Sequence, residues 1–144
     1  MLNKIIFKGN GYNASDSALL TKDKNLDTIK LKKLLYNLGF KLTSIGTIFI
    51  IEELSFFFNN NLDGFSLLKD AYSISAQLHN IEIKNVQWAV ESAITSMLRF
   101  SNTELLKNIF FWYTDNQVIT PREFMSTMIL YLEENEKEYS KSTN

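Results

Sequence analysis

Several residue types that carry chemistry or break helices are rare or absent in this chain of 144 residues. It has no cysteine, which excludes disulfides, thiolate metal ligands and cysteine nucleophiles together. One proline and five glycines leave long segments without a helix breaker, which disfavours a loop-rich β fold. No apolar run reaches the length of a membrane span, and the N-terminus lacks the apolar core of a signal peptide. We therefore expect a soluble, cytoplasmic protein without a membrane partner.

The polar residues that an enzyme needs are also scarce. The only histidine, His79, is expected at a helix end, where its ring can bond terminal carbonyl groups. The adjacent glutamates at 52–53 and at 133–134 point in different directions on a helix, so we interpret them as solvated faces and not as acid–base pairs. There is no Gly-rich phosphate loop, paired His–Glu metal motif or nucleophile elbow. The sequence predicts a protein that is not an enzyme, with no cofactor, metal or small-molecule substrate.

Helical periodicity and capping residues predict an all-α protein, a compact bundle of about five to six helices that contains a helix-turn-helix. The helical domain is expected over residues 25–138, followed by a polar, frayed tail over 139–144. Residues 1–24 are interpreted as an arm, either a flexible leader or a small functional addition. The predicted helices cover residues 25–38, 44–58, 70–79, 84–99, 102–113 and 121–136.

The first predicted helix carries a cluster of lysines. Asn25 is expected to cap it and Gly39 to end it in the left-handed conformation. Its expected apolar stripe is Leu26, Ile29, Leu34, Leu35 and Leu38. Lys30, Lys32 and Lys33 lie mainly off that stripe, as a solvated face or as contacts to phosphate. The next helix, 44–58, is apolar almost all round and is expected at the centre of the core.

Residues 69–99 predict two helices separated by a short turn at 80–83. On the second helix one apolar face is formed by Val86, Ala89, Val90, Ala93, Ile94 and Met97. The residues left on the outside are Lys84, Gln87, Trp88, Glu91, Ser92 and Thr95. A DNA-binding helix-turn-helix has this pattern, but any packed helical hairpin has it too, so both interpretations stay open.

Charge is distributed unevenly along the chain. Residues 1–41 contain eight lysines and three acidic residues, a net of +5, whereas residues 42–144 contain seven basic and thirteen acidic residues, a net of −6. The second helix of the pair is nearly neutral. Because phosphate contacts supply most of the affinity for DNA, this neutrality counts against strong binding by that helix alone.

Residues 24–136 resemble the C-terminal DNA-binding effector domain of the sporulation stage-zero master response regulator. The resemblance rests on the order and spacing of short segments over about four-fifths of the chain. These segments are LLYNLGF (34–40), IGTIFIIEEL (45–54), SISAQLHN (73–80), VQWAVESAITSML (86–98) and PREFMSTMILYLEE (121–134).

The resemblance implies a stand-alone transcription regulator of sporulation that binds the major groove of double-stranded DNA as a dimer. Residues 84–99 would be the recognition helix. The expected DNA-binding residues are Lys84, Gln87, Trp88 and Glu91 near base edges, with Arg99, Lys30 and Lys33 on the backbone. The receiver domain of the family is not expected, because residues 1–24 are too short for one.

Three positions depart from the basic recognition helix of the family. Gln87 can still bind adenine, but Trp88 cannot make a bidentate guanine contact. Glu91 repels phosphate unless it accepts a hydrogen bond from cytosine. An exposed Trp88 favours a protein partner, whereas a neighbouring loop that covers it would make it structural. The rival hypothesis is therefore a protein-interaction module on the same fold, which binds a related regulator or itself without reading DNA.

Overall fold

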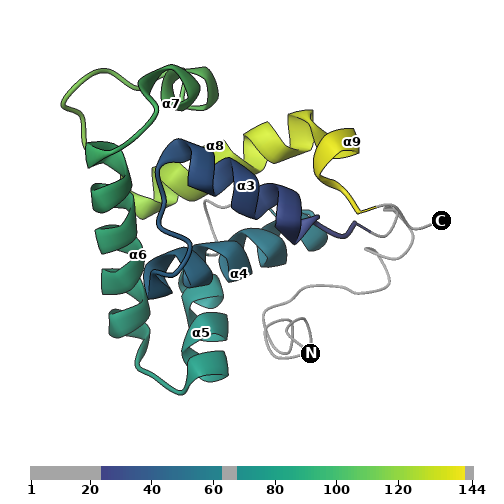
Figure 1. The fold of residues 1–144 in the computed structure, drawn as a ribbon. Coiled ribbons are helices and arrows are strands. Elements are labelled where there is room, and N and C mark those ends of the chain that lie inside the picture. Colours follow the sequence, from purple (N-terminus) through teal and green to yellow (C-terminus); the bar gives the residue numbers. More distant parts are fainter. Residues whose placement is uncertain (1–23, 63–67, 142–144) are drawn as a thin grey trace.

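The computed structural model describes residues 24–62 and 68–141, and this part of the chain is all-helical, as the sequence predicts. Its seven helices are α3 (Thr28–Leu38), α4 (Ile45–Asn59), α5 (Leu68–His79), α6 (Ile83–Arg99), α7 (Thr103–Ile109), α8 (Pro121–Glu134) and α9 (Glu136–Tyr139) (Figure 1). No helix in the described ranges is long and apolar enough to cross a membrane. Except for Lys24, the expected arm over residues 1–24 lies outside the described residues.

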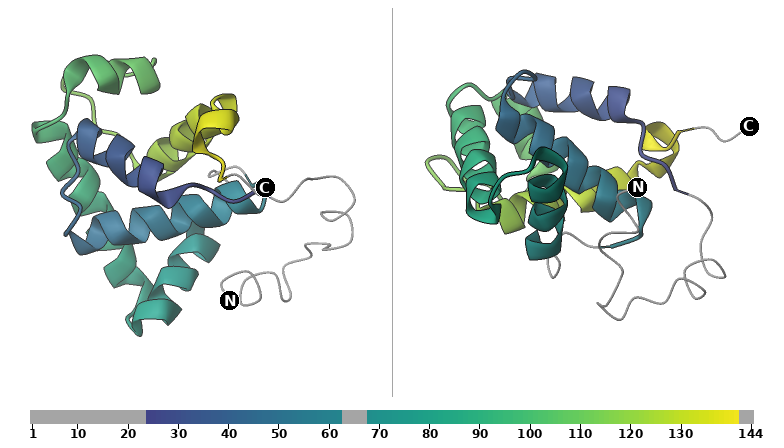
Figure 2. Two further views of the ribbon diagram at one scale, coloured as in Figure 1. Left: turned by 45° about the vertical axis from the view of Figure 1, so that its right-hand side comes forward. Right: turned by 90° about the horizontal axis from the view of Figure 1, so that it is seen from below.

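Helix α4 lies at the centre, and α3, α5, α6 and α8 all pack against it (Figures 1 and 2). Its sequence, IGTIFIIEELSFFFN, is apolar almost all round, which is the pattern of a helix buried on every side. Phe56, Phe57 and Phe58 are all buried, so three consecutive aromatic rings contribute to the core. The prediction of a central buried helix is confirmed.

The closest approach between α4 and α6 occurs at Gly46. A Cβ atom at this position would lie 2.1 Å from the carbonyl oxygen of Ala89 and 2.8 Å from the Cβ atom of Ala93. Real Cβ atoms do not approach other atoms so closely, so glycine is required here for the contact itself. The contact seats α6 directly on the first turn of α4 and thereby fixes which face of α6 points outward.

Helix α3 begins later than predicted. Asp27, and not Asn25, is the N-cap, because its carboxylate accepts hydrogen bonds from the backbone N–H groups of Ile29 at 3.1 Å and Lys30 at 3.2 Å. The side chain of Leu31 lies in the core, whereas Ile29 is 64% exposed. The expected stripe was therefore wrong at Ile29, because the inward face is set by Leu31 and the later leucines, and a residue two positions before Leu31 lies on the opposite side of a helix.

The C-terminal end of the described chain is packed and not frayed. Tyr139 in α9 is buried, and Ser140 forms an isolated antiparallel bridge with Leu26. Next to it, the backbone N–H of Lys141 donates to the carbonyl oxygen of Asn25 at 2.7 Å. Packing thus continues past residue 138, where the sequence led us to expect the end of the helical domain.

Helix α7 ends at Ile109, four residues before its predicted end near 113. Phe110 leaves the helix and is fully buried, where its ring stacks on Phe124 of α8 with 5.4 Å between centroids. Trp112 then donates from its indole nitrogen to the hydroxyl of Thr127 at 3.0 Å. Burial of these aromatic rings against α8 outweighs continuation of the helix.

Helix α8 starts with the capping box that its sequence predicts. The Thr120 hydroxyl accepts from the backbone N–H of Glu123 at 3.1 Å, and the Glu123 carboxylate accepts from the backbone N–H of Thr120 at 3.0 Å. Pro121 occupies the first helical position. This reciprocal pair fixes where α8 begins, close to the N-terminal half of α6.

Substitution of Gly46 by alanine tests the contact between α4 and α6. The added methyl group has to displace the backbone of Ala89, so we expect Gly46→Ala to lower the free energy of unfolding by about 2 kcal/mol or more. Urea denaturation followed by circular dichroism measures this. Asn85→Ala, an exposed change on α6, is the control and should stay within about 0.5 kcal/mol of wild type. Wild-type stability of Gly46→Ala would contradict the close contact.

Candidate nucleic-acid interface

Helices α5 and α6 are joined by the three residues 80–82 and pack on each other as well as on α4. Asn80 has a φ of 54°, a left-handed conformation that asparagine tolerates better than most residues. Helix α6 then begins at Ile83, one residue before the predicted start. Its buried residues are Val86, Val90, Ala93, Ile94 and Met97, with Ala89 partly buried, so the predicted inner face is confirmed.

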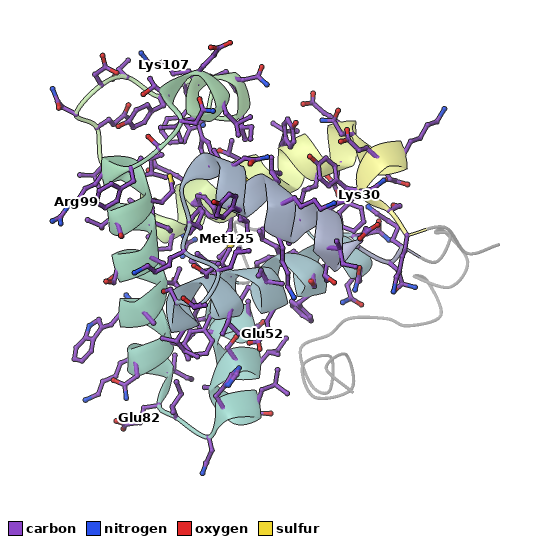
Figure 3. All side chains as sticks on the ribbon, in the orientation of Figure 1. Lys30, Glu52, Glu82, Arg99, Lys107 and Met125 are labelled. Atoms are coloured by element: carbon purple, nitrogen blue, oxygen red, sulfur yellow. The ribbon has the colours of Figure 1, made fainter. Side chains whose placement is uncertain are left out.

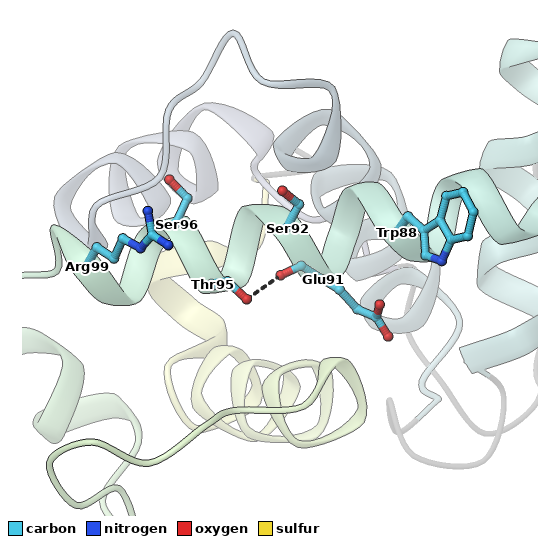
Figure 4. A pocket seen from close by; sticks show the side chains of 6 residues that line it. All are labelled: Trp88, Glu91, Ser92, Thr95, Ser96 and Arg99. Carbon is cyan, nitrogen blue, oxygen red and sulfur yellow. Dashed lines mark hydrogen bonds between the residues drawn. The ribbon is translucent and has the colours of Figure 1, made fainter.

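The outer face of α6 is solvent-accessible along its length and forms one wall of a shallow depression (Figure 4). The residues that line the depression are Trp88, Glu91, Ser92, Thr95, Ser96 and Arg99. Figure 4 shows Trp88 and Arg99 at its two ends, with the short polar side chains between them. Trp88 is 61% exposed, so no described loop covers it. Four of the expected site residues, Lys84, Gln87, Trp88 and Arg99, are thus exposed on one helix, with Glu91 half-buried beside them.

Three side-chain contacts lie on or beside this outer face. The amide nitrogen of Gln87 donates to the carboxylate of Glu91, one turn further along, at 3.2 Å. The ammonium group of Lys84 lies 5.9 Å from the centre of the Trp88 ring and 4.0 Å from the carboxylate of Glu82. Exposed pairs of this kind contribute little stability, about 0 to 1 kcal/mol, so Lys84 can turn to another anion at low cost.

One flank of the outer face is the loop 39–44, which leads from α3 into α4. At its start, Gly39 has a φ of 119°, and a Cβ atom there would lie 3.0 Å from the carbonyl oxygen of Phe100, just after α6. At its end, Gly46 touches Ala89 in the middle of α6. The loop therefore runs beside α6, and Lys41 is an exposed residue of this loop. Lys41 was not among the expected site residues, because only tertiary contacts bring its loop to α6.

The opposite flank is a groove of about 600 Å³ between the N-terminal ends of α5 and α8 and the first half of α6. Its charged lining residues are Lys69 on α5, Glu91 on α6 and Arg122 on α8. Gln87 also lines it, so the groove and the outer face of α6 share one edge. Two basic side chains therefore stand beside the recognition helix that the sequence proposes, and neither was among the expected site residues.

The lysines expected from the first helix lie elsewhere. Figure 3 shows Lys30 beside α9, at the end of the molecule opposite Arg99 on α6. The ammonium group of Lys30 donates to the carbonyl oxygen of Glu138 in α9 at 2.9 Å. Lys33 is exposed on the same helix, α3. The structure does not bring Lys30 to the outer face of α6, so the expected site divides into two groups.

A second polar site, between α4 and α5, was missed by the sequence analysis. Glu53 is 0% exposed, so the interpretation of residues 52 and 53 as a solvated face was wrong. Ser75 donates to Glu52 at 2.8 Å, and the Nε2 atom of His79 lies 2.8 Å from the other oxygen of Glu52. His79 thus bonds a carboxylate and not the helix-end carbonyls that we expected. A signal was present, since two glutamates interrupt a helix that is otherwise apolar all round.

The environment of Glu53 favours its neutral form. Burial raises the pKa of Glu53 well above its ordinary value; the Ser75 hydroxyl lowers this pKa when its hydrogen points to Glu53, and the neighbouring Glu52 charge raises it further. One carboxylate oxygen of Glu53, Oε1, has no hydrogen-bond partner. A buried ionised carboxylate with an unpaired oxygen is costly, whereas the protonated form avoids most of that cost.

Comparisons with protein-family models, curated proteins and solved structures find no match to this chain. In the part of the chain that the structure describes, no group of three or more His, Cys, Asp or Glu side chains is placed to hold a metal ion. The functional argument therefore depends on the geometry of α6 and its two flanks.

Exposure of Trp88 leads to a direct prediction. Trp88→Ala should change the free energy of unfolding by less than about 0.5 kcal/mol, because the exposed ring contributes little to folding. Trp112→Ala removes a packed ring and its bond to Thr127, and we expect a loss above about 1 kcal/mol. Iodide quenching gives a second measurement, in which Trp88→Phe should remove most of the quenchable fluorescence. Equal destabilisation by the two alanine substitutions would show that Trp88 is covered.

Proposed function

We propose that this chain is a sequence-specific DNA-binding transcription regulator in which α5, the turn 80–82 and α6 act as a helix-turn-helix. The observation that carries the proposal is the exposed polar face of α6, which lies between two flanks with basic side chains. A recognition helix needs such a face to enter the major groove, and flanking cations to contact the phosphates on either side. The resemblance to the effector domain of the sporulation regulator supports the same assignment.

The pair formed by Gln87 and Glu91 is suited to base recognition. An amide nitrogen has two hydrogens, and the bond to Glu91 uses only one of them. The second hydrogen and the amide oxygen remain for the N7 and N6 groups of an adenine, which a glutamine binds in bidentate fashion. Glu91 therefore serves in this proposal as the group that orients Gln87, in place of a direct contact to phosphate or cytosine.

The proposed backbone contacts come from both sides of α6. Lys84 and Arg99 lie on the helix itself, Lys41 lies on the loop before α4, and Lys69 lies at the start of α5. Each lysine that neutralises a phosphate releases condensed counterions, so binding weakens as salt rises. These contacts supply the positive charge that α6 lacks by itself. Trp88 is exposed on the same face, where its ring can contact the methyl group of a thymine.

The test is an anisotropy titration with a random duplex pool, followed by selection of enriched sequences, at low and at physiological salt. Gln87→Ala should reduce discrimination at one base pair by about 1 to 3 kcal/mol. Lys41→Ala and Lys69→Ala should weaken binding to all sequences and each reduce the salt slope by about 1. Asn108→Ala on α7 and Lys137→Ala on α9 are the matched controls, because both residues are exposed away from α6.

Absence of sequence-selective binding at both salt concentrations would overturn the proposal. A salt slope that is unchanged by Lys41→Ala and Lys69→Ala would exclude the two flanks as phosphate contacts. Glu91→Ala separates the two roles of that residue. If it orients Gln87, its removal should lower selectivity while non-specific affinity rises, because a negative charge has been lost.

A second function is favoured by the exposure of Trp88. An exposed tryptophan on a nearly neutral face is typical of protein-binding hot spots. In this alternative the outer face of α6 contacts a related regulator or a second copy of the chain. Sedimentation velocity on the wild type and on Trp88→Ala distinguishes the two functions, because self-association that Trp88→Ala abolishes, without any DNA binding by the wild type, would support the interaction module.

A further inference from the structure

Four polar side chains form a continuous hydrogen-bonded series across the contact between α4 and α5. Glu53 and Ser75 are fully buried, and Ser75 Oγ lies 3.4 Å from Glu53 Oε2 and 2.8 Å from Glu52 Oε1. The other oxygen of Glu52 lies 2.8 Å from His79 Nε2, at the end of α5. This hydrogen-bonded series therefore begins at Glu53, which has no solvent contact, and ends at His79, whose side chain is 31% exposed.

The number of hydrogen atoms available for donation determines which hydrogen bonds this series of side chains can form. A serine hydroxyl has one hydrogen, so it can donate to only one of two carboxylates. The shorter distance assigns that hydrogen to Glu52. The contact between Glu53 and Ser75 is then a hydrogen bond only if Glu53 carries a proton and donates it to Ser75 Oγ. With both carboxylates ionised, Glu53 would have no donor on either oxygen, since its Oε1 atom has no partner.

We infer that Glu53 is a proton-binding site that holds α5 against α4. In the protonated state, Glu53 donates to Ser75, Ser75 donates to Glu52, and Glu52 bonds His79. Release of the proton to water leaves two negative charges beside one buried hydroxyl, and their repulsion favours separation of α5 from α4. Because α5 leads through the turn 80–82 into α6, the same proton stabilises the position of α6. This inference does not rest on DNA binding.

The charged groups around Glu53 do not offset its ionisation. Among the described residues, no lysine or arginine forms an ion pair with it. On α4 its charged neighbour is Glu52, and on α5 the titratable groups are Tyr72 and His79, whose ring packs on Phe49 with 5.0 Å between centroids. From α6 and α8, Glu91 and Arg122 act on Tyr72.

The pH dependence follows from the direction of the shift. The pKa of Glu53 is raised by burial above the model-compound value of 4.5 that applies once the contact opens and the side chain is solvated. The stabilising contribution is thus complete below that value and is lost as pH rises through the raised pKa of the closed state. Between these two pKa values, separation of α5 from α4 releases one proton. The equilibrium constant for this opening should therefore rise about tenfold per pH unit.

Native-state hydrogen exchange of the α5 amides, without DNA and corrected for the intrinsic exchange rate, tests this inference. In the wild type we expect the opening equilibrium of α5 to rise with pH, by up to about tenfold per unit. Glu53→Gln should remove that dependence, because the amide is always neutral and can donate to Ser75 as the protonated acid does. The two proteins differ only at residue 53, so the difference between their pH dependences reports Glu53. Glu134→Gln, on the exposed face of α8, is the matched control and should behave as wild type.

The same pH dependence in wild type and Glu53→Gln would overturn the proton site. A second measurement needs no variant. In wild-type protein with ¹³C-labelled glutamate carboxyl groups, one resonance, that of Glu53, should titrate well above the ordinary range of a glutamate carboxyl group. If every glutamate resonance titrates together in the ordinary range, Glu53 is ionised in the folded protein and the inference fails.

Discussion

The tight packing of α6 on α4 is the constraint on which the rest of the structure depends. It is possible only because Gly46 has no side chain, which lets the carbonyl of Ala89 come within 2.1 Å of where a Cβ atom would stand. This contact orients α6 so that its apolar residues enter the core and its polar residues face outward. Both proposed functions of the outer face, DNA binding and partner binding, follow from that single orientation.

Burial of the central helix α4 builds the core but also places an acidic side chain inside it. An all-round apolar α4 buries four phenylalanines, but it also carries the carboxyl group of Glu53 into the core, out of contact with solvent. The protein accommodates that group through Ser75 and Glu52, which extend a hydrogen-bonded chain to His79 near the surface. The contact between α4 and α5 therefore contains both packed apolar side chains and the titratable Glu53. The stability of this contact depends on whether Glu53 is protonated.

The chemistry of the α6 face differs from that of a strongly basic DNA-binding helix. Its two cations are matched by Glu82 and Glu91, and additional positive charge comes from neighbouring elements, from Lys41 on one side and from Lys69 on the other. Under the proposed function, such an arrangement would separate two tasks, since Gln87 and Glu91 on the helix would select bases while residues outside it would contact phosphates. The exposed Trp88 on this face is the feature that a protein partner would use instead.

The sequence by itself determined the all-α class, the buried face of α6 and the capping box of α8, because periodicity and capping act between residues at most four positions apart. It did not determine the start of α3, where Asp27 competes with Asn25, or the end of α7, where burial of Phe110 against α8 decides. Only the tertiary structure placed the loop that contains Lys41 beside α6, Lys30 beside α9 and Glu53 in the core. Those placements depend on contacts between segments far apart in the chain, which no local pattern encodes.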